Sequence, residues 1–133
     1  FDDLGLTLGY STLKAYGRSK LMNLLTAREL QRRLTGKNVV ASSFHPGAVR
    51  TPIWNKSGAL PRLLGLAFYP FMKTIGQGSD TFVWLASSEE QASRGADGHY
   101  FYEGKRAETA KFATDEDANR LWQISEELIA PYY

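Results

Sequence analysis

The chain has 133 residues, of which 43% are hydrophobic and 23% charged, and its 16 basic and 14 acidic side chains nearly cancel. This balance is typical of one modest globular domain, and it argues against nucleic acid as a partner because no basic field is present to attract it. The absence of cysteine excludes disulfides and thiolate zinc sites within the chain and fits a reducing compartment. No signal peptide and no apolar run of roughly 20 residues is visible. We therefore expect a cytoplasmic location, with membrane association of a longer protein left open.

A long amphipathic helix is the first predicted element, over residues 11–34. Ser11 is a suitable N-cap because its hydroxyl can accept a hydrogen bond from the first helical turn, and Gly36 is a suitable terminator. The apolar side chains that recur at helical spacing are Leu13, Tyr16, Leu24, Leu25, Ala27 and Leu30. The caps and the spacing together predict one long helix.

A short buried strand is predicted next, over residues 38–44, because this stretch begins with β-branched residues and is bounded by Gly36 and Pro46. A helix followed by such a strand indicates one crossover of a parallel sheet. Residues 46–75 mix proline, glycine and large apolar side chains, which predicts a loop with short helical pieces. Its apolar stretch, residues 63–72, is too short to span a membrane and is interpreted as a buried segment or one that contacts a lipophilic ligand.

The second half of the chain has the pattern of two helices, over residues 78–87 and 115–129, and of one strand over residues 99–102. Thr114 is the predicted N-cap of the last helix, and residues 89–98 form a polar turn. Three helices and two strands are too few for a parallel sheet that is covered on both faces. We therefore expect the remaining strands to come from a piece that precedes Phe1 in a larger protein.

Tyr16 and Lys20 are the candidate catalytic residues. Side chains four residues apart share one face of a helix, so the Lys20 ammonium can stabilise the ionised form of the Tyr16 phenol. Two unit charges about 4 Å apart attract each other by roughly 1 kcal/mol in bulk water and by about 4 kcal/mol at an effective dielectric constant near 20. The pair is therefore expected to act as an acid/base only where it is partly removed from water. A chance match is the alternative, because the chain contains seven tyrosines.

The turn His45-Pro46-Gly47, with the hydroxyl of Thr51 a few residues later, supplies the second part of the predicted site. It follows a predicted strand, and the carboxyl edge of a doubly wound sheet is where ligands bind. A plain chain reversal is the alternative interpretation of a Pro-Gly pair. His45 is interpreted as a turn-capping or packed histidine rather than as a proton relay.

Several stretches resemble, in order and spacing, the short-chain dehydrogenase/reductase family and in particular its retinol dehydrogenase-like branch. They are Tyr16-Gly17-Arg18-Ser19-Lys20 with Leu21-Met22-Asn23, Arg28-Glu29-Leu30, His45-Pro46-Gly47-Ala48-Val49-Arg50-Thr51, Phe71-Met72-Lys73-Thr74 with Gln77-Gly78, and Gly98-His99-Tyr100-Phe101. The resemblance covers nearly the whole chain. It implies an α/β fold in which residues 1–133 are the C-terminal half of a doubly wound Rossmann-type parallel sheet without the N-terminal βαβ units. The catalytic helix of that single domain would lie at about 11–34, and its substrate loop at about 52–75.

The resemblance also implies a function, the transfer of a hydride between NAD(P) and an alcohol, aldehyde or ketone that is lipophilic, with NADP slightly favoured over NAD and no metal. The residues that it places at the cofactor are Tyr16, Lys20, Pro46, Gly47, Val49 and Thr51. Tyr16 would exchange the proton at the substrate oxygen, and Lys20 would hold the nicotinamide ribose. The Pro-Gly turn and Val49 would lie along the nicotinamide, and Thr51 would hydrogen-bond its carboxamide or the pyrophosphate.

The chain departs from the family pattern at its beginning. In the family a glycine-rich phosphate turn, an Asn-Ala-Gly strand and a catalytic serine precede the tyrosine, and none of them is found here; Ser11 is too close to Tyr16 to replace that serine. This chain alone is therefore expected to be inactive. Two alternatives stay open, namely a non-catalytic interaction module that keeps the second half of the fold, and a membrane-surface protein that acts through residues 63–72. A homodimer is also left open.

The remaining aromatic and basic side chains have less specific interpretations. Four aromatic side chains are interpreted as lining either a substrate pocket or the core and a lid, namely Trp54, Phe68, Tyr69 and Phe71. Trp84, Leu121 and Trp122 are interpreted as packing residues. The basic stretches Gln31-Arg32-Arg33 and Lys105-Arg106 are interpreted as solvated faces.

Overall fold

A computed structural model describes residues 1–51, 68–89 and 98–133, and the chain divides into two compact units. The first unit contains Phe1–Ser43, residues 98–99 and Glu108–Tyr133, and the second contains residues 44–51, 68–89 and Tyr100–Ala107. Their elements are α1 (Thr12–Arg33) and α5 (Asp115–Ile129) in the first unit, and α3 (Ile75–Ser87), β1 (Ser43–His45, whose first residue belongs to the first unit), β2 (Tyr100–Tyr102) and β3 (Lys105–Ala107) in the second. Tyr69–Phe71 and Ala130–Tyr132 form short 3-10 helices.

The predicted long helix is confirmed as α1, and its caps are those that the sequence indicates. The Ser11 hydroxyl accepts a hydrogen bond from the Lys14 N–H at 3.3 Å. After the cap residue Leu34 the chain turns through Gly36, whose φ of 80° lies in the left-handed region that favours glycine. Local signals therefore suffice to set both ends of this helix.

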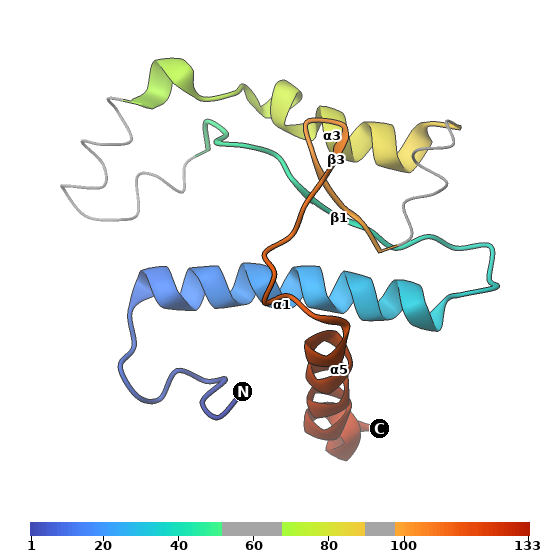
Figure 1. The fold of residues 1–133 in the computed structure, drawn as a ribbon. Coiled ribbons are helices and arrows are strands. Elements are labelled where there is room, and N and C mark those ends of the chain that lie inside the picture. The colour runs from blue at the N-terminus through green and yellow to red at the C-terminus, as the bar shows by residue number, and fades with distance from the viewer. Residues whose placement is uncertain (52–67, 90–97) are drawn as a thin grey trace. The chain divides into compact units, whose positions relative to one another are not determined.

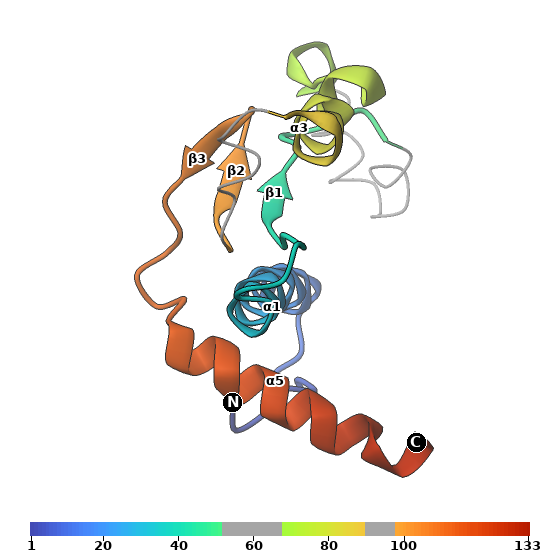
Figure 2. The same cartoon turned by 90° about the vertical axis from the view of Figure 1, so that its right-hand side faces the viewer.

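Helix α5 is confirmed over the predicted residues, and it packs across α1 (Figures 1 and 2). The Thr114 hydroxyl caps it by accepting a hydrogen bond from the Asp117 N–H at 3.0 Å. The apolar core of the first unit is Leu25, Ala113, Ala118 and Leu121, with Leu21, Met22 and Leu24 packed against it. The packing interpretation of Leu121 is therefore confirmed, and the side of α1 that carries Leu25 is the side that faces α5.

The strand predicted over residues 38–44 is shorter and displaced, because β1 contains only Ser43–His45. The N–H of Ala41 donates to the side-chain Oε1 of Gln31 at 2.7 Å, and its carbonyl accepts from the N–H of Gly98. Val39 and Val40 are about half exposed, at 55% and 46%. A side chain of α1 thus occupies the Ala41 N–H, a backbone group that the β-branched pattern had assigned to a longer strand.

The predicted strand at 99–102 is confirmed as β2, and it continues into a hairpin that the sequence did not predict. Strand β2 pairs antiparallel with β3, and the sheet order is β1-β2-β3, as Figure 2 shows. Glu103 and Gly104 connect the two strands with φ angles of 52° and 71°, as a two-residue hairpin turn of the primed type requires. Strand β3 was missed because Lys105-Arg106-Ala107 contains no β-branched or aromatic residue.

Helix α3 begins at Ile75, three residues before the predicted start at 78. Thr74 is its N-cap and forms a capping box with Gln77, since each side chain bonds the other residue's backbone N–H. Trp84 packs edge-on against Phe101 with ring centroids 5.8 Å apart, which supports its interpretation as a packing residue. Of the predicted loop and turn, Trp54, residues 52–67 and residues 90–97 lie outside the described residues.

The described residues thus form an α/β arrangement of three α-helices and a mixed three-stranded sheet, consistent with a part of a Rossmann-type fold. That they are its C-terminal half stays a prediction. Within the described ranges, no helix combines the length and the apolar character needed to cross a bilayer.

Candidate active site

Tyr16 and Lys20 lie on one exposed face of α1. Leu25 follows Tyr16 by about two and a half helical turns, so the two side chains leave opposite sides of the helix. Tyr16 is 54% exposed, whereas Leu25 is 4% exposed in the core with α5. The Lys20 Nζ lies 5.4 Å from the centroid of the Tyr16 ring. The four-residue spacing therefore brings an ammonium and a phenol together on the side of α1 that the α5 contact leaves open.

The segment before α1 is organised by Asp3. Its carboxylate accepts hydrogen bonds from the N–H groups of Thr7 and Leu8, at 2.8 and 3.0 Å, and these bonds lower the pKa of Asp3. The carbonyl of Asp3 accepts a hydrogen bond from the guanidinium of Arg18 on α1. Residues 3–8 are thereby attached to the turn of α1 that carries Tyr16.

The His45-Pro46-Gly47 turn lies at the end of β1, in the second unit. Gly47 has a φ of 85°, a conformation in which any other residue would be strained. Its N–H donates a hydrogen bond to Nδ1 of His45 at 2.9 Å. The interpretation of His45 as a turn-capping residue is therefore confirmed.

The backbone around Val49 is paired with the chain just before α3. Val49 and Lys73 form a parallel bridge, in which the Lys73 N–H donates to the Ala48 carbonyl at 2.8 Å and the Arg50 N–H donates to the Lys73 carbonyl at 2.9 Å. The guanidinium of Arg50 donates to the carbonyls of Tyr69 and Pro70 and stacks on the Tyr69 ring. The backbone pairing thus fixes the loop at Ala48 and Arg50, the two neighbours of Val49. The side chain of Arg50 fixes it further by its contacts with Tyr69 and Pro70.

The six predicted site residues fall into two groups. Tyr16 and Lys20 are brought together by α1 in the first unit. In the second unit the loop from β1 carries the half-buried residues Pro46, Gly47 and Val49 and the exposed residue Thr51. Each group has the local geometry that the sequence predicted, and the chemical roles of all six residues stay predictions.

Lys73, Gly78 and Glu103 surround the loop but were given no role from the sequence. The Lys73 ammonium binds Oε1 of Glu103 at 2.6 Å, and this hydrogen bond lowers the pKa of the Glu103 carboxyl. An added Cβ on Gly78 would approach Cγ2 of Val49 to 2.6 Å. The signal that could have drawn attention to Lys73 and Gly78 is the family-like stretch at Phe71-Met72-Lys73-Thr74 with Gln77-Gly78.

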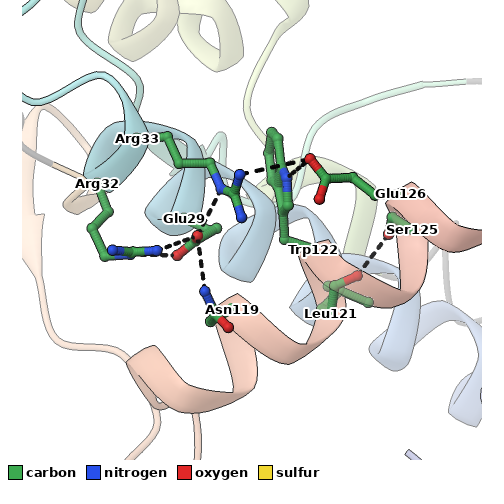
Figure 3. Close-up of polar contacts among 8 residues, drawn as sticks. All are labelled: Glu29, Arg32, Arg33, Asn119, Leu121, Trp122, Ser125 and Glu126. Atoms are coloured by element: carbon green, nitrogen blue, oxygen red, sulfur yellow. Dashed lines mark hydrogen bonds and ion pairs between the residues drawn. The ribbon is translucent and has the colours of Figure 1, made fainter.

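A buried carboxylate on α1 was also missed. Glu29 is 1% exposed, and its oxygens accept hydrogen bonds from Arg32 and Arg33 of α1 and from Asn119 of α5, as Figure 3 shows. The fork of Arg32 contacts both oxygens at 2.7 Å. Mainly through Arg32, the pKa of Glu29 is lowered to about 2. The two arginines are therefore more than a solvated face, which the (i, i+3) and (i, i+4) spacing from Glu29 could have indicated.

Metal chemistry has no candidate site in the part of the chain that the structure describes. There, no three side chains of histidine, aspartate or glutamate gather closely enough to hold an ion.

The chain is similar to dehydrogenases over nearly its whole length, although no protein-family model matches it. It is 41% identical over 134 residues to retinol dehydrogenase 14 of Homo sapiens, an alignment that covers 97% of this chain and 39% of the relative. It is 40% identical to retinol dehydrogenase 12 of Mus musculus, with 97% and 40% covered. It is 35% identical to short-chain dehydrogenase TIC 32 B of Brassica napus, with 90% and 38% covered. The chain therefore spans about two fifths of the length of these relatives. The predicted resemblance to the short-chain dehydrogenase/reductase family, with retinol dehydrogenases among the relatives, is confirmed.

Proposed function

We propose that the protein is an NAD(P)-dependent oxidoreductase of alcohols and carbonyl compounds, and that this chain is the C-terminal part of its single Rossmann-type catalytic domain. The observation that carries the proposal is the Tyr16–Lys20 pair on an exposed face of α1, in a chain that is 41% identical to a retinol dehydrogenase. The names of three relatives as dehydrogenases support the reaction class.

Tyr16 is the proposed acid/base. Its side chain is half exposed, so its hydroxyl is open to a substrate oxygen, and Lys20 places a positive charge beside the ring. The attraction between an ammonium and a phenolate grows where water is displaced, as a bound cofactor and substrate would do here. Tyr16 would then give a proton to a carbonyl oxygen during reduction, or take one from an alcohol during oxidation.

The loop after β1 fits the nicotinamide part of a dinucleotide. Gly47 presents a turn without a side chain, the backbone at Val49 is fixed by its bridge to Lys73, and the hydroxyl of Thr51 is exposed. When bound, the nicotinamide supplies the site from which the hydride leaves or at which it arrives. Pro46, Gly47 and Val49 would lie along the ring, Thr51 would bind its carboxamide or the pyrophosphate, and Lys20 would hold its ribose. NADP is favoured slightly over NAD.

A lipophilic alcohol, aldehyde or ketone is the proposed substrate class. Phe68, Tyr69 and Phe71, at the end of the predicted substrate loop, are 59%, 50% and 85% exposed. Exposed aromatic side chains of this kind bind apolar molecules by removing their surface from water. The names of two relatives as retinol dehydrogenases support a lipophilic alcohol.

The decisive experiment replaces Tyr16 by phenylalanine in the full-length protein. Loss of the hydroxyl removes the proposed proton transfer and should lower kcat by about 10²–10⁴-fold, with little change in cofactor affinity. Tyr10→Phe is the matched control, because Tyr10 is also exposed, at 68%, but lies outside α1. Turnover is measured by the absorbance of the reduced nicotinamide. Full turnover by Tyr16→Phe would show that Tyr16 is not the acid/base, whereas absence of turnover in the native protein would favour the non-catalytic interaction module instead.

The position of this chain within its domain is tested by the sequence encoded before Phe1. We expect a glycine-rich strand-turn-helix that binds the pyrophosphate, followed by a strand that carries a serine. If the gene encodes neither feature, the proposal that residues 1–133 complete a Rossmann-type domain is wrong.

A further inference from the structure

The chain from Lys73 to Gly78 holds the loop from Gly47 to Arg50 within the second unit. The backbone bridge between Val49 and Lys73 aligns the two segments. Two side-chain contacts then add to it, one from Lys73 onto Gly47 and one from Val49 onto Gly78. Each involves a glycine whose missing side chain leaves the space that the partner fills.

The first contact is made by the stem of Lys73. A Cβ added to Gly47 would lie 3.3 Å from both Cδ and Cε of Lys73 and 3.5 Å from its Nζ. The methylene groups of Lys73 therefore lie on the side of Gly47 from which a Cβ would project. Its ammonium lies 2.6 Å from Oε1 of Glu103 and 5.5 Å from the centroid of the Tyr102 ring. The β2–β3 hairpin thus fixes the far end of the lysine that covers Gly47.

The anchor on the hairpin is itself well fixed. Glu103 has a φ of 52°, which a residue with a side chain adopts only when its surroundings impose it. The N–H of the next residue, Gly104, donates to the hydroxyl of Thr81 at 3.0 Å, and Thr81 is 6% exposed on α3. The turn that receives the Lys73 ammonium is therefore attached to the helix that follows Lys73.

The second contact is the tighter one. A Cβ added to Gly78 would lie 2.6 Å from Cγ2 and 3.1 Å from Cγ1 of Val49, and the first distance is shorter than real Cβ contacts. Gly78 is buried within α3. Val49 is β-branched, so its side chain has little freedom to rotate away. A methyl group at residue 78 would therefore push Val49 and its backbone away from α3.

We propose that Lys73 and Gly78 are positioning residues for the cofactor loop. Lys73 holds the turn at Gly47, and Gly78 allows Val49 to approach α3, so that together they set the backbone that binds the nicotinamide. This inference rests on the proposed function, because it assigns the loop to a dinucleotide. Both residues act through the loop rather than on the reacting atoms.

The test uses three variants of the full-length protein. Lys73→Met keeps the apolar stem and removes the ammonium, and it should raise the Kd and KM for the cofactor on the order of tenfold while kcat at saturating cofactor changes little. Lys73→Arg keeps a cation for Glu103 and should restore most of the affinity. Gly78→Ala misplaces the loop and should lower kcat/KM for the cofactor by about 10²-fold. Cofactor binding is measured by titration of reduced-nicotinamide fluorescence.

Two control variants separate this effect from general damage. Gly76→Ala makes the same change in the same helix, but its added Cβ would meet only the Thr74 hydroxyl oxygen at 3.9 Å, so affinity should not change. Lys105→Met removes an exposed lysine from the same hairpin. If Gly78→Ala does not fold, the two lysine variants test the inference alone. Cofactor affinity should then fall in Lys73→Met and be largely retained in Lys73→Arg.

The outcomes distinguish this inference from the proposed function. Unchanged cofactor affinity in Lys73→Met and Gly78→Ala, together with lost turnover in Tyr16→Phe, would overturn the inference and leave the proposed function intact. Failure of Lys73→Arg to recover the affinity lost by Lys73→Met would also overturn it. Absence of both turnover and cofactor binding in the native full-length protein would instead remove the proposed function on which the inference rests.

Discussion

Different kinds of interaction stabilise the interior of each of the two units. In the first unit, α1 and α5 share an apolar core around Leu25 and Leu121, and a buried carboxylate, Glu29, joins the helices. In the second unit the structure depends on backbone pairing, on Gly47 with its φ of 85°, on Gly78 without room for a Cβ, and on a two-residue hairpin turn. The first unit therefore depends on side-chain burial, and the second depends on backbone conformation.

In the first unit, the residues that pack the structure differ from those proposed to carry the chemistry. In the second unit, the same residues are proposed to do both. Tyr16 and Lys20 lie opposite the packed side of α1, so the residues that stabilise this helix are not those proposed to act on a substrate. Around Val49 the residues that pack the loop are also those proposed to shape it for a cofactor. We therefore expect that changes in the first unit can alter stability and activity independently, whereas changes at the contacts around Val49 alter both.

The largest expected effect comes from the core of the first unit. Leu25→Ala removes a side chain that is 4% exposed and should lower the free energy of unfolding by about 3 kcal/mol, through lost burial and the cavity left behind. Leu128→Ala, at an α5 position that is 68% exposed, should change it by less than about 0.5 kcal/mol. Urea unfolding of the full-length protein measures both, and equal effects would contradict the proposed location of the core.

The next effect is that of the buried carboxylate. Glu29→Gln should lower the free energy of unfolding by about 2 kcal/mol near neutral pH, because charged hydrogen bonds from Arg32, Arg33 and Asn119 are weakened. Glu126→Gln, at an exposed position of α5, is the control and should have a smaller effect.

The effect of Glu29→Gln should depend on pH. The pKa of Glu29 is lowered to about 2 in the folded chain, so the unfolded chain, with an ordinary glutamate pKa near 4.3, takes up a proton first as the pH falls. The contribution of Glu29 is therefore complete above about pH 5 and is lost toward pH 2. Urea unfolding should show a smaller difference between the native protein and Glu29→Gln at about pH 3 than at pH 7. A difference independent of pH would mean that Glu29 is not a low-pKa carboxylate.

A smaller effect tests the backbone of the second unit. Gly104→Ala should lower stability by about 1 kcal/mol, because its φ of 71° strains any residue with a Cβ, although the added atom meets nothing within 4 Å. Gly17→Ala, also without a contact within 4 Å but inside α1, should raise stability by about 0.5–1 kcal/mol through its better helix propensity. The same substitution is thus expected to have opposite signs in the two units, as thermal unfolding can show.

These contrasts also explain which parts of the fold could be predicted. Helices α1 and α5 were predicted within a residue or so of their bounds, because an N-cap hydroxyl and helical periodicity are local signals. The displaced β1 and the unpredicted β3 depend on partners in other elements, namely Gln31 of α1 for Ala41 and Phe101 of β2 for Arg106. Local propensity does not contain that information.

The site divides in the same way. The shared face of Tyr16 and Lys20 follows from a four-residue spacing, and the capping of Gly47 by His45 follows from adjacent residues. The contact of Gly78 with Val49 joins positions about 30 residues apart, so no spacing rule could indicate it. The residues that shape the loop were therefore recognised only once the fold was known.

The smallest effect concerns Ser11, a serine that precedes Tyr16 and could be mistaken for a catalytic residue. Its hydroxyl accepts a hydrogen bond from the Lys14 N–H at 3.3 Å, which is the bond of an N-cap. Ser11→Ala should therefore lower stability by about 0.5 kcal/mol, at the low end of the N-cap range because the core with α5 already holds α1. Thr74→Ala, which breaks a reciprocal capping box, should cost about 1 kcal/mol. Since Ser11 is engaged with the backbone, kcat of Ser11→Ala should stay within about twofold of the native value. A large loss of kcat with unchanged stability would instead place Ser11 in the proton-transfer machinery and would require a different catalytic arrangement around Tyr16.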